Sequence, residues 1–344
     1  MPTITRSLRQ FLHGSLAEFA ELSEMTPMVT ATTLTALVVL LANLQEEGTL
    51  LIPEVFLCED LEKTLQLLPD RSVIEIGTAN NAPTAISQSI KKCGPLAIGG
   101  WCIFICPIQS GFRFGLFRGS LNPLSVSVSQ TLFSEPLIGI KVVRLFKTAS
   151  GCVELCNHLG TSHCILLNDR PETASLPNAY TEELVALMCR DISESVRDPA
   201  KTYMGKTIDR ALAACHGTLI AVTKSSRVPV FLRDGVLLKQ PLDLQSAVLE
   251  KHRTSTDTVA EHRLVANASL VRGMISSDGI TVFNTKGKLL AYSCFIRSPN
   301  HIGGKPVVGG ARTRAYEALC KKIGNGIEAV FIQSQDGWTK FSKE

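Results

Sequence analysis

The sequence lacks a large excess of charge of either sign. Its 35 Lys and Arg residues nearly balance 31 Asp and Glu residues, which gives a formal net charge of +4 at pH 7. The basic residues are scattered along the chain, whereas a general nucleic-acid-binding surface gathers them into a patch or stripe. The composition therefore does not indicate such a surface, although it leaves room for a local anion site.

A long hydrophobic run is also lacking. The most apolar stretch, Leu34 to Leu44, is shorter than the ~20 residues that a membrane-spanning helix needs, and polar residues follow it directly. The start of the chain mixes Arg6, Arg9 and Glu18 among its apolar residues, which is unlike a secretory leader. We therefore expect a buried helix at the apolar stretch, no leader and no membrane partner.

No Cys-x-x-Cys pair occurs among the eleven cysteines. Five residues of types that bind zinc lie close together, namely Cys152, Cys156, His158, His163 and Cys164. Without a matching second half, their spacing favours a β-hairpin over a zinc site. An odd number of cysteines without a leader is typical of the reducing cytoplasm, so we expect a cytoplasmic protein.

Two domains are expected from the length of 344 residues and from a globular balance of 45% apolar and 19% charged residues. Residues 1–167 are expected to form a mixed α+β domain of unknown function. It opens with two helical patterns and continues as short strands, of which Trp101–Ile108 and Val142–Phe146 are the clearest. Residues 168–180 are polar and contain proline, which predicts a linker. Residues 181–344 then form the second domain.

Local signals predict the elements that follow. Apolar and turn residues from Gly111 to Val128 predict hairpins. Thr181 is expected to cap a helix, and Pro199 to start another that reaches Cys215. The remaining predicted elements are strands at 218–223 and 230–232, a helix at 256–275, a hairpin at 278–296, a helix from 311 to about 324, and a hairpin at 329–341. The order predicts the fold class α/β (α+β), with a C-terminal mixed β-sheet flanked by helices.

A glycine-rich loop is the clearest local sign of a ligand site. Gly303-Gly304 and Gly309-Gly310 bracket a loop that leads into a helix beginning near Ala311. Glycines allow close backbone approach, and the first turn of a helix presents unpaired N–H groups that attract phosphate. Arg312 and Arg314 add forked cationic donors suited to a polyphosphate. The alternative is a basic turn that faces solvent.

Asp278 is a second candidate, because it precedes Gly279 just before a predicted strand. Its carboxylate could hold a divalent metal or a ribose hydroxyl while the backbone passes close to a base. An Asp-Gly pair is also a common turn. Near the end of the chain, Ser334, Gln335 and Asp336 are by themselves ordinary hairpin residues.

Taken in order, the motifs from Gly217 to Phe341 resemble the catalytic domain of bacterial diadenylate cyclases. That family has an apolar Gly-Ala-Leu-Ile-Val strand, then Asp-Gly-Ala, then Gly-Thr-Arg-His-Arg-Ala, and then a Ser-Glu-Glu segment. This chain has Gly-Thr-Leu-Ile-Ala-Val, Asp-Gly-Ile, Gly-Lys-Leu-Leu-Ala, Gly-Ala-Arg-Thr-Arg-Ala and Val-Phe-Ile-Gln-Ser-Gln-Asp-Gly in the same order. The resemblance implies a diadenylate-cyclase-like fold for the second domain.

In that family, two protomers hold two ATP molecules face to face and join them into cyclic di-AMP and pyrophosphate. The resemblance makes a homo-oligomer possible. It implies that Asp278 orients a metal ion (Mg²⁺ or Mn²⁺) and a hydroxyl, and that Arg312 and Arg314 clamp phosphate. The other nucleotide contacts that it implies are Gly279, Ile280, Gly309, Gly310, Ala311, Thr313, Ser334 and Gln335.

The chain departs from the family pattern at several of these positions. Ile280 replaces an alanine, Ala311 and Thr313 replace a threonine and a histidine, and Gln335 replaces an acidic residue. Asp336 could serve as the missing metal ligand only if the hairpin shifts by one residue. These losses weaken turnover more than binding, because glycine amides and two arginines still hold phosphate.

The departures favour a nucleotide-binding sensor or regulator that takes ATP or a cyclic dinucleotide. Proteins that carry such a domain behind an unrelated amino-terminal domain have been viewed as nucleotide sensors in bacterial signalling, and this chain resembles them. An active diadenylate cyclase, which would need Mg²⁺ or Mn²⁺, is the first alternative. An interaction scaffold with an empty inherited pocket is the second.

Overall fold

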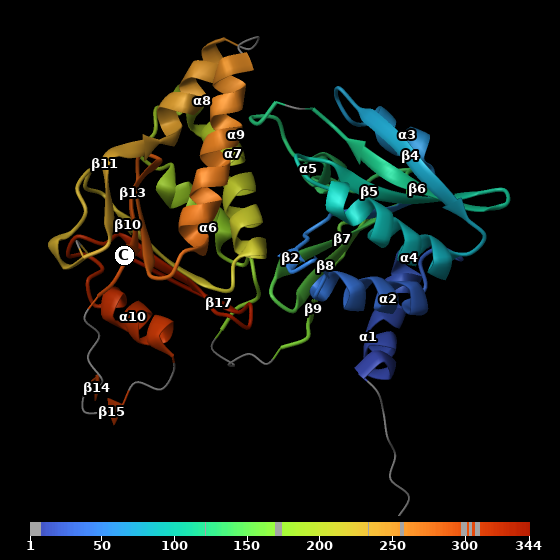
Figure 1. The fold of residues 1–344 in the computed structure, drawn as a ribbon, viewed down its shortest axis with the longest axis horizontal. Helices are drawn as coiled ribbons and strands as arrows, with labels where there is room; N and C mark the ends of the chain where they lie inside the picture. The colour runs from blue at the N-terminus through green and yellow to red at the C-terminus, as the bar shows by residue number, and fades with distance from the viewer. Residues whose placement is uncertain are drawn as a thin grey trace, which may run out of the picture. The chain divides into compact units, whose positions relative to one another are not determined.

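The computed structural model describes residues 8–120, 122–168, 174–232, 234–254, 258–296, 301–302, 305–306 and 310–344. The chain forms two compact units (Figure 1). The first comprises Met1–Leu121, Val126–Lys147 and Gly151–Leu167, and the second comprises Asn122–Ser125, Thr148–Ser150 and Asn168–Glu344. Each unit has a large mixed β-sheet flanked by helices. Among the described residues, no helix has the length and apolar character needed to cross a bilayer.

A seven-stranded mixed sheet forms the centre of the first unit, in the order β4-β6-β5-β3-β7-β8-β9. Strand β3 runs parallel to β5 and antiparallel to β7. Helices α1, α2 and α4 pack on one face of this sheet, and α3 and α5 pack on the other. The bounds are α1 Leu8–Leu22, α2 Ala31–Ala42, β1 Gln45–Glu46, β2 Thr49–Leu50, β3 Val55–Cys58, α3 Leu61–Gln66, β4 Ser72–Ala79, α4 Ala82–Cys93, β5 Cys102–Ile108, β6 Gly111–Arg118, α5 Val128–Phe133, β7 Val142–Ala149, β8 Cys152–Asn157 and β9 Ser162–Leu166.

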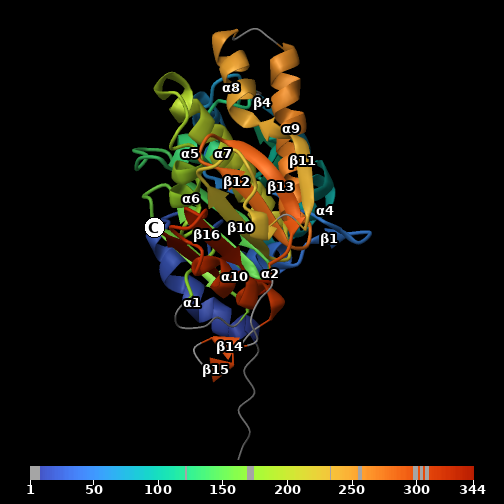
Figure 2. The same ribbon diagram turned by 90° about the vertical axis from the view of Figure 1, so that its left-hand side faces the viewer.

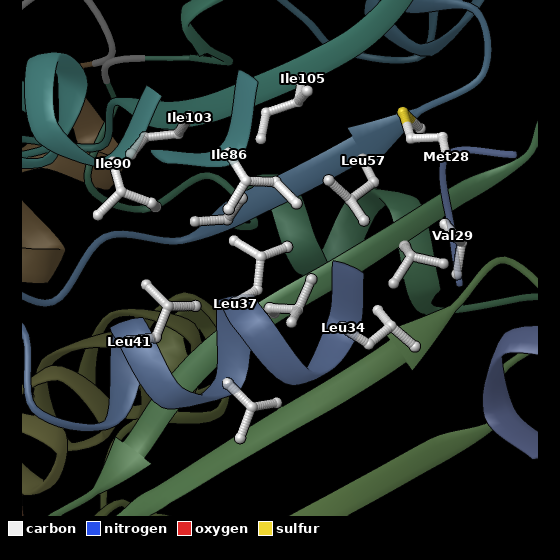
Figure 3. Packing of buried hydrophobic residues seen from close by; sticks show 14 of the residues in the cluster. Met28, Val29, Leu34, Leu37, Leu41, Leu57, Ile86, Ile90, Ile103 and Ile105 are labelled. Atoms are coloured by element: carbon white, nitrogen blue, oxygen red, sulfur yellow. The ribbon is translucent and has the colours of Figure 1, made fainter. Parts of the chain in front are cut away.

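Helix α2 fills the core on the first face of this sheet (Figure 3). Its Leu34, Leu37 and Leu41 are buried and face apolar side chains from β3, β5 and α4. The Thr30 hydroxyl accepts the Thr33 N–H, and the Thr33 hydroxyl accepts the Thr30 N–H, so a capping box starts the helix. The buried helix predicted for this apolar stretch is confirmed.

The cysteine-rich segment of the first unit is a β-hairpin, as predicted. Strands β8 and β9 pair antiparallel, with Glu154 opposite Cys164. The Sγ atoms of Cys152 and Cys164 lie 3.1 Å apart across this hairpin. The strands predicted at Trp101–Ile108 and Val142–Phe146 are also confirmed, as β5 and β7.

Among the described residues from Gly111 to Val128 there is one strand, β6, and not several hairpins. Strand β6 pairs with β5 and ends at Arg118. The Ser127 hydroxyl then accepts the Gln130 N–H, while the Gln130 side chain accepts the Ser127 N–H, and α5 begins. The prediction of hairpins was wrong because a turn closed by a hydrogen bond from the Ser125 N–H to the Asn122 carbonyl (3.0 Å) follows the strand and leads into α5, which only Val128 of this stretch enters.

A six-stranded mixed sheet forms the centre of the second unit, in the order β11-β13-β12-β10-β16-β17. Strand β10 runs parallel to β12 and antiparallel to β16. Helices α6 to α9 pack on one face and α10 packs on the other (Figures 1 and 2). The bounds are α6 Thr181–Met188, α7 Glu194–Ala214, β10 Thr218–Thr223, β11 Val236–Asp243, α8 Leu244–Arg253, α9 Thr258–Ser276, β12 Ile280–Asn284, β13 Lys288–Cys294, β14 His301–Ile302, β15 Lys305–Pro306, α10 Ala311–Cys320, β16 Ala329–Gln333 and β17 Thr339–Lys343.

Two predicted helix starts in this unit are wrong. Thr181 is the first residue of α6 and not its cap, because Tyr180 occupies the capping position. Pro199 lies inside α7, which begins at Glu194. Val196 is buried on the same face as Ala200 and Tyr203, so packing stabilises a helical turn ahead of the proline.

The predicted strand at Val230–Leu232 is also wrong. These residues form a 3₁₀ turn after Pro229, closed by a hydrogen bond from the Leu232 N–H to the Pro229 carbonyl (2.9 Å). Proline fixes the backbone angle that such a turn needs. The strand that follows, β11, has no sequence signal because it is an edge strand with exposed Val236 and Leu237.

Part of the predicted linker packs on the second unit. Ser175 exchanges two backbone hydrogen bonds with Thr339 at the start of β17, with N···O distances of 2.9 and 3.0 Å. The rings of Tyr180 and Phe341 lie 5.8 Å apart. The chain entering the second unit is thereby fastened beside β17.

A polar contact joins the α6–α7 turn to the β12–β13 turn. The Thr285 hydroxyl donates to the Asp191 carboxylate (2.6 Å), and the Asp191 N–H donates to the Thr285 carbonyl (2.9 Å). The Thr285 hydroxyl is the main reason that the pKa of Asp191 lies below its usual range, and Arg190 acts in the same direction. Since the folded-state pKa is depressed, the ionised carboxylate stabilises the fold above the unfolded pKa of ~3.9.

Replacing Asp191 with asparagine is expected to lower the unfolding free energy at pH 7 by ~1.5 kcal/mol, the usual contribution of a hydrogen bond to a charged group. The difference in unfolding free energy between the variant and wild type should shrink as the pH falls through the folded-state pKa of Asp191. The wild-type carboxylate is then protonated, so wild type loses the charge that the variant already lacks. Urea denaturation at pH 7 and at pH 3 measures both. Asp198→Asn is the control, because that side chain is 92% exposed; an equal loss in both variants would contradict the prediction.

Candidate anion site

Three strands bring distant segments to one edge of the second sheet. Because β10 and β12 are parallel, with Leu219 opposite Ile280, Gly217 and Gly279 precede the two strands at the same edge. Strand β16 runs the other way, with Gln333 opposite Thr218, so its last residues arrive at this edge too. Residues 216–217, 278–279 and 334–335 are therefore neighbours at this edge.

Two of these positions require glycine. Gly217 has φ +93°, and a Cβ atom there would lie 2.8 Å from the Gln333 carbonyl oxygen and 2.9 Å from the Gln335 nitrogen. Gly279 has φ +95°, and a Cβ atom would lie 2.8 Å from the Cys294 carbonyl oxygen. Other residues are strained at such φ values and would overlap these backbone atoms. The edge is a closely packed backbone surface.

Helix α10 begins beside this edge. Its N-cap is Gly310, and no side chain of the described residues caps the first turn. The first N–H groups of a helix carry the positive end of the dipole and bind anions. Arg312, in this first turn, adds a full positive charge.

The Arg312 side chain connects α10 to both parallel strands. Its Nη1 donates to the His216 carbonyl (3.0 Å), and its Nη2 lies 3.7 Å from Asp278 Oδ1. The structure thus brings Asp278 and Arg312 together, although they lie far apart in the sequence. The Arg312 side chain is 35% exposed and that of Asp278 is 80% exposed. An ion pair this exposed contributes only ~0–1 kcal/mol, so Arg312 can exchange Asp278 for an anionic ligand at little cost.

The other predicted site residues occupy different environments. Ala311 is exposed, Thr313 and Arg314 are half-buried in the first turns of α10, and Gln335 is exposed in the β16–β17 turn. The Ile280 side chain is buried in the core between the sheet and α10, so only its backbone lies at the edge. Ser334 is half-buried in the same turn as Gln335. Gly309, which was also predicted to contact the nucleotide, lies outside the described residues.

The metal ligands predicted from the sequence are Asp278 and Asp336. Within the described part of the chain, no three His, Cys, Asp or Glu side chains form a group that could hold a metal. Asp336 lies in the β16–β17 turn, where its N–H donates to the Ser334 hydroxyl (3.0 Å). Mg²⁺ commonly binds one or two carboxylates together with substrate phosphates. An Mg²⁺ or Mn²⁺ ion on Asp278 and Asp336 therefore stays a prediction for the nucleotide-bound protein.

Several residues at this edge had no clear sequence signal. Burial raises the pKa of the Cys215 thiol to about 11, and the Gly217 N–H and Arg312 oppose that rise. Gln333 is buried and donates its side-chain amide to the Leu212 carbonyl (2.8 Å). The one sign in the sequence is that Gln333 ends an otherwise apolar strand. Beside Gly279, Ser293 has φ +49°.

Comparison with known proteins adds no relative: no protein-family model matches the chain, and neither a curated protein nor a solved structure matches it. Functional inference for this chain therefore depends on its motifs and on the geometry of this edge.

Proposed function

We propose that the second unit binds an adenine nucleotide or cyclic dinucleotide and acts as a nucleotide sensor or regulator. The observation that carries the proposal is the position of Arg312, which joins the α10 N-terminus to the Asp278 carboxylate and the His216 carbonyl. A phosphate group at the helix start replaces Asp278 as the partner of Arg312. The exposed ion pair is easily exchanged.

The Asp278 carboxylate restricts what the site accepts. A negative charge repels phosphate, whereas it accepts a hydrogen bond from a hydroxyl group. The ligand therefore places a phosphate at α10 and a ribose hydroxyl at Asp278. ATP and a cyclic dinucleotide each carry both groups.

Binding, rather than turnover, is the activity that the residues favour. Positioned donors and metal ligands at the reacting groups supply most of the rate in nucleotidyl transfer. Compared with the matching positions of diadenylate cyclases, Ala311 lacks a hydroxyl, Thr313 lacks an imidazole and Gln335 lacks a carboxylate. Glycine amides and arginine suffice to hold phosphate.

Replacing Asp278 with alanine is expected to weaken ATP binding by about 10-fold, the loss of one hydrogen bond to a charged group. The same change should leave pyrophosphate binding unchanged or tighter, because pyrophosphate has no ribose and the carboxylate repels it. Isothermal titration calorimetry with ATP, cyclic di-AMP and pyrophosphate measures each affinity. Asp198→Ala is the matched control, because this acid of α7 is 92% exposed and lies outside the candidate site.

Calorimetry and a product assay on the wild-type protein distinguish a sensor from the two alternative functions. Saturable heat with ATP or cyclic di-AMP, without cyclic product after incubation with ATP and Mg²⁺ or Mn²⁺, agrees with a sensor. Formation of cyclic di-AMP that is lost in Asp278→Asn would replace the sensor with an active diadenylate cyclase. No binding of any nucleotide by wild type would leave an interaction scaffold.

A further inference from the structure

The outer strand of the first unit's sheet exposes apolar side chains on both faces. Strand β4 is at one end of the strand order, next to β6. Val73 and Ile74 are each 47% exposed. Successive residues of a strand point to opposite faces, so both faces are partly exposed at this end of β4, ahead of the part where Ile76 and Ala79 pack against the core. Natural proteins usually protect such an edge, because it is a template for pairing with another strand.

The regular part of this edge is short and well defined. Asp70 has φ +50° and accepts a hydrogen bond from the Ser120 hydroxyl (3.2 Å), which fixes the turn before the strand. The register with β6 shifts between Glu75 and Gly77. A bulge of this kind bends a strand and interrupts its regular spacing, although pairing with β6 resumes at Gly77. The regular free edge therefore extends from Ser72, the first residue of β4, to Glu75, and Arg71 directly precedes it.

We propose that two copies of this chain associate by antiparallel pairing of their β4 strands, in a register centred on Val73. In this register Val73 lies opposite Val73 of the second copy, and Arg71 lies opposite Glu75 of the second copy, twice by symmetry. Val73 and Glu75 share one face of the strand, and pairing in this register extends the strand by one residue to include Arg71. The result is a continuous sheet across the two copies, with an apolar centre between two pairs of opposite charge.

Charge complementarity selects this register. Centring on Glu75 would place two like charges directly opposite each other, which is destabilising. Centring on Ile74 would place Val73 opposite Glu75 and leave Arg71 unpaired. Arg71 is exposed, and the Glu75 side chain is 52% exposed with only a 3.8 Å contact to Arg113. Both side chains are available for a partner strand.

The test is the oligomeric state of the full chain. Sedimentation velocity from micromolar to near-millimolar protein should show a reversible monomer–dimer equilibrium. Val73→Lys should raise the dissociation constant by at least about 10-fold, because it places two lysines opposite each other. Val230→Lys, at a residue of the second unit that is 75% exposed, is the control and should leave the equilibrium unchanged.

A charge exchange makes the register testable even if Val73→Lys unfolds. Arg71→Glu alone and Glu75→Arg alone should each weaken the dimer by about 10-fold, because each places like charges opposite each other. The double variant should recover most of the wild-type affinity. A wild-type chain that stays monomeric, a dimer that is indifferent to Val73→Lys, or a double variant that does not recover would each overturn the proposal.

Discussion

Replacing Arg312 and Arg314 together with alanine is expected to weaken the binding of ATP or cyclic di-AMP by about 100-fold. Each guanidinium supplies at least one charge-assisted hydrogen bond, worth ~1.5 kcal/mol or more, and two of them correspond to about two decades in the dissociation constant. Arg312 already points at the edge where Asp278 lies. Calorimetric titration of wild type and variant with the same nucleotide measures the change.

A matched control distinguishes specific contacts from net charge. Arg227→Ala with Arg253→Ala removes the same two positive charges from exposed positions of the second unit. Arg227 follows the opposite end of β10, and Arg253 ends α8, away from α10 (Figure 1). This variant should bind as wild type does. If both double variants lose the same affinity, the arginines of α10 act only through the overall charge, and the phosphate site is refuted.

Replacing Gly279 with alanine is expected to lower the unfolding free energy by ~2–4 kcal/mol and to abolish nucleotide binding. The left-handed backbone is strained for alanine, and the added Cβ overlaps the backbone in a packed region. That atom would lie 2.8 Å from the Cys294 carbonyl oxygen and 2.9 Å from the Ser293 carbonyl carbon. Urea denaturation and calorimetry measure the two effects.

Gly205→Ala is the opposite case and serves as the control. Gly205 lies in the middle of α7, where an added Cβ meets no described atom within 4 Å. Alanine should stabilise this helix by ~0.5–1 kcal/mol and leave nucleotide binding unchanged. If Gly279→Ala is as stable as wild type, the backbone at the start of β12 is not packed as closely as described.

Apolar runs bounded by turn residues were enough to predict much of the second sheet. Strand β10 spans the predicted Thr218–Thr223, and the hairpins of β12 with β13 and of β16 with β17 are formed as expected. Buried central strands carry this signal because both faces need apolar residues. Strand β11 was missed for the converse reason, since an exposed edge strand needs no such run.

Helix boundaries were less predictable because packing overrides local preference. Proline favours the first turn of a helix, yet α7 begins at Glu194, more than one turn before Pro199. Burial of Val196 stabilises the turn that a local rule would exclude. Tertiary contacts of this kind are not visible in a single sequence.

For the candidate site, motifs identified the side chains but not the backbone groups. Asp278 and Arg312 were singled out from their neighbours in sequence, and they meet in the structure. The His216 carbonyl, which accepts a hydrogen bond from Arg312, had no signal, because a backbone oxygen is the same at every position. The packing of Gly217 against the end of β16 likewise depends on strand register.

The pairing of Ser175 with Thr339 has a mechanical consequence. Thr339 begins β17, which follows the turn that holds Ser334 and Gln335. Ser175 is therefore held against the same hairpin that borders the candidate anion site. A ligand that displaces this turn would therefore also act on the backbone pairing of Ser175 with Thr339.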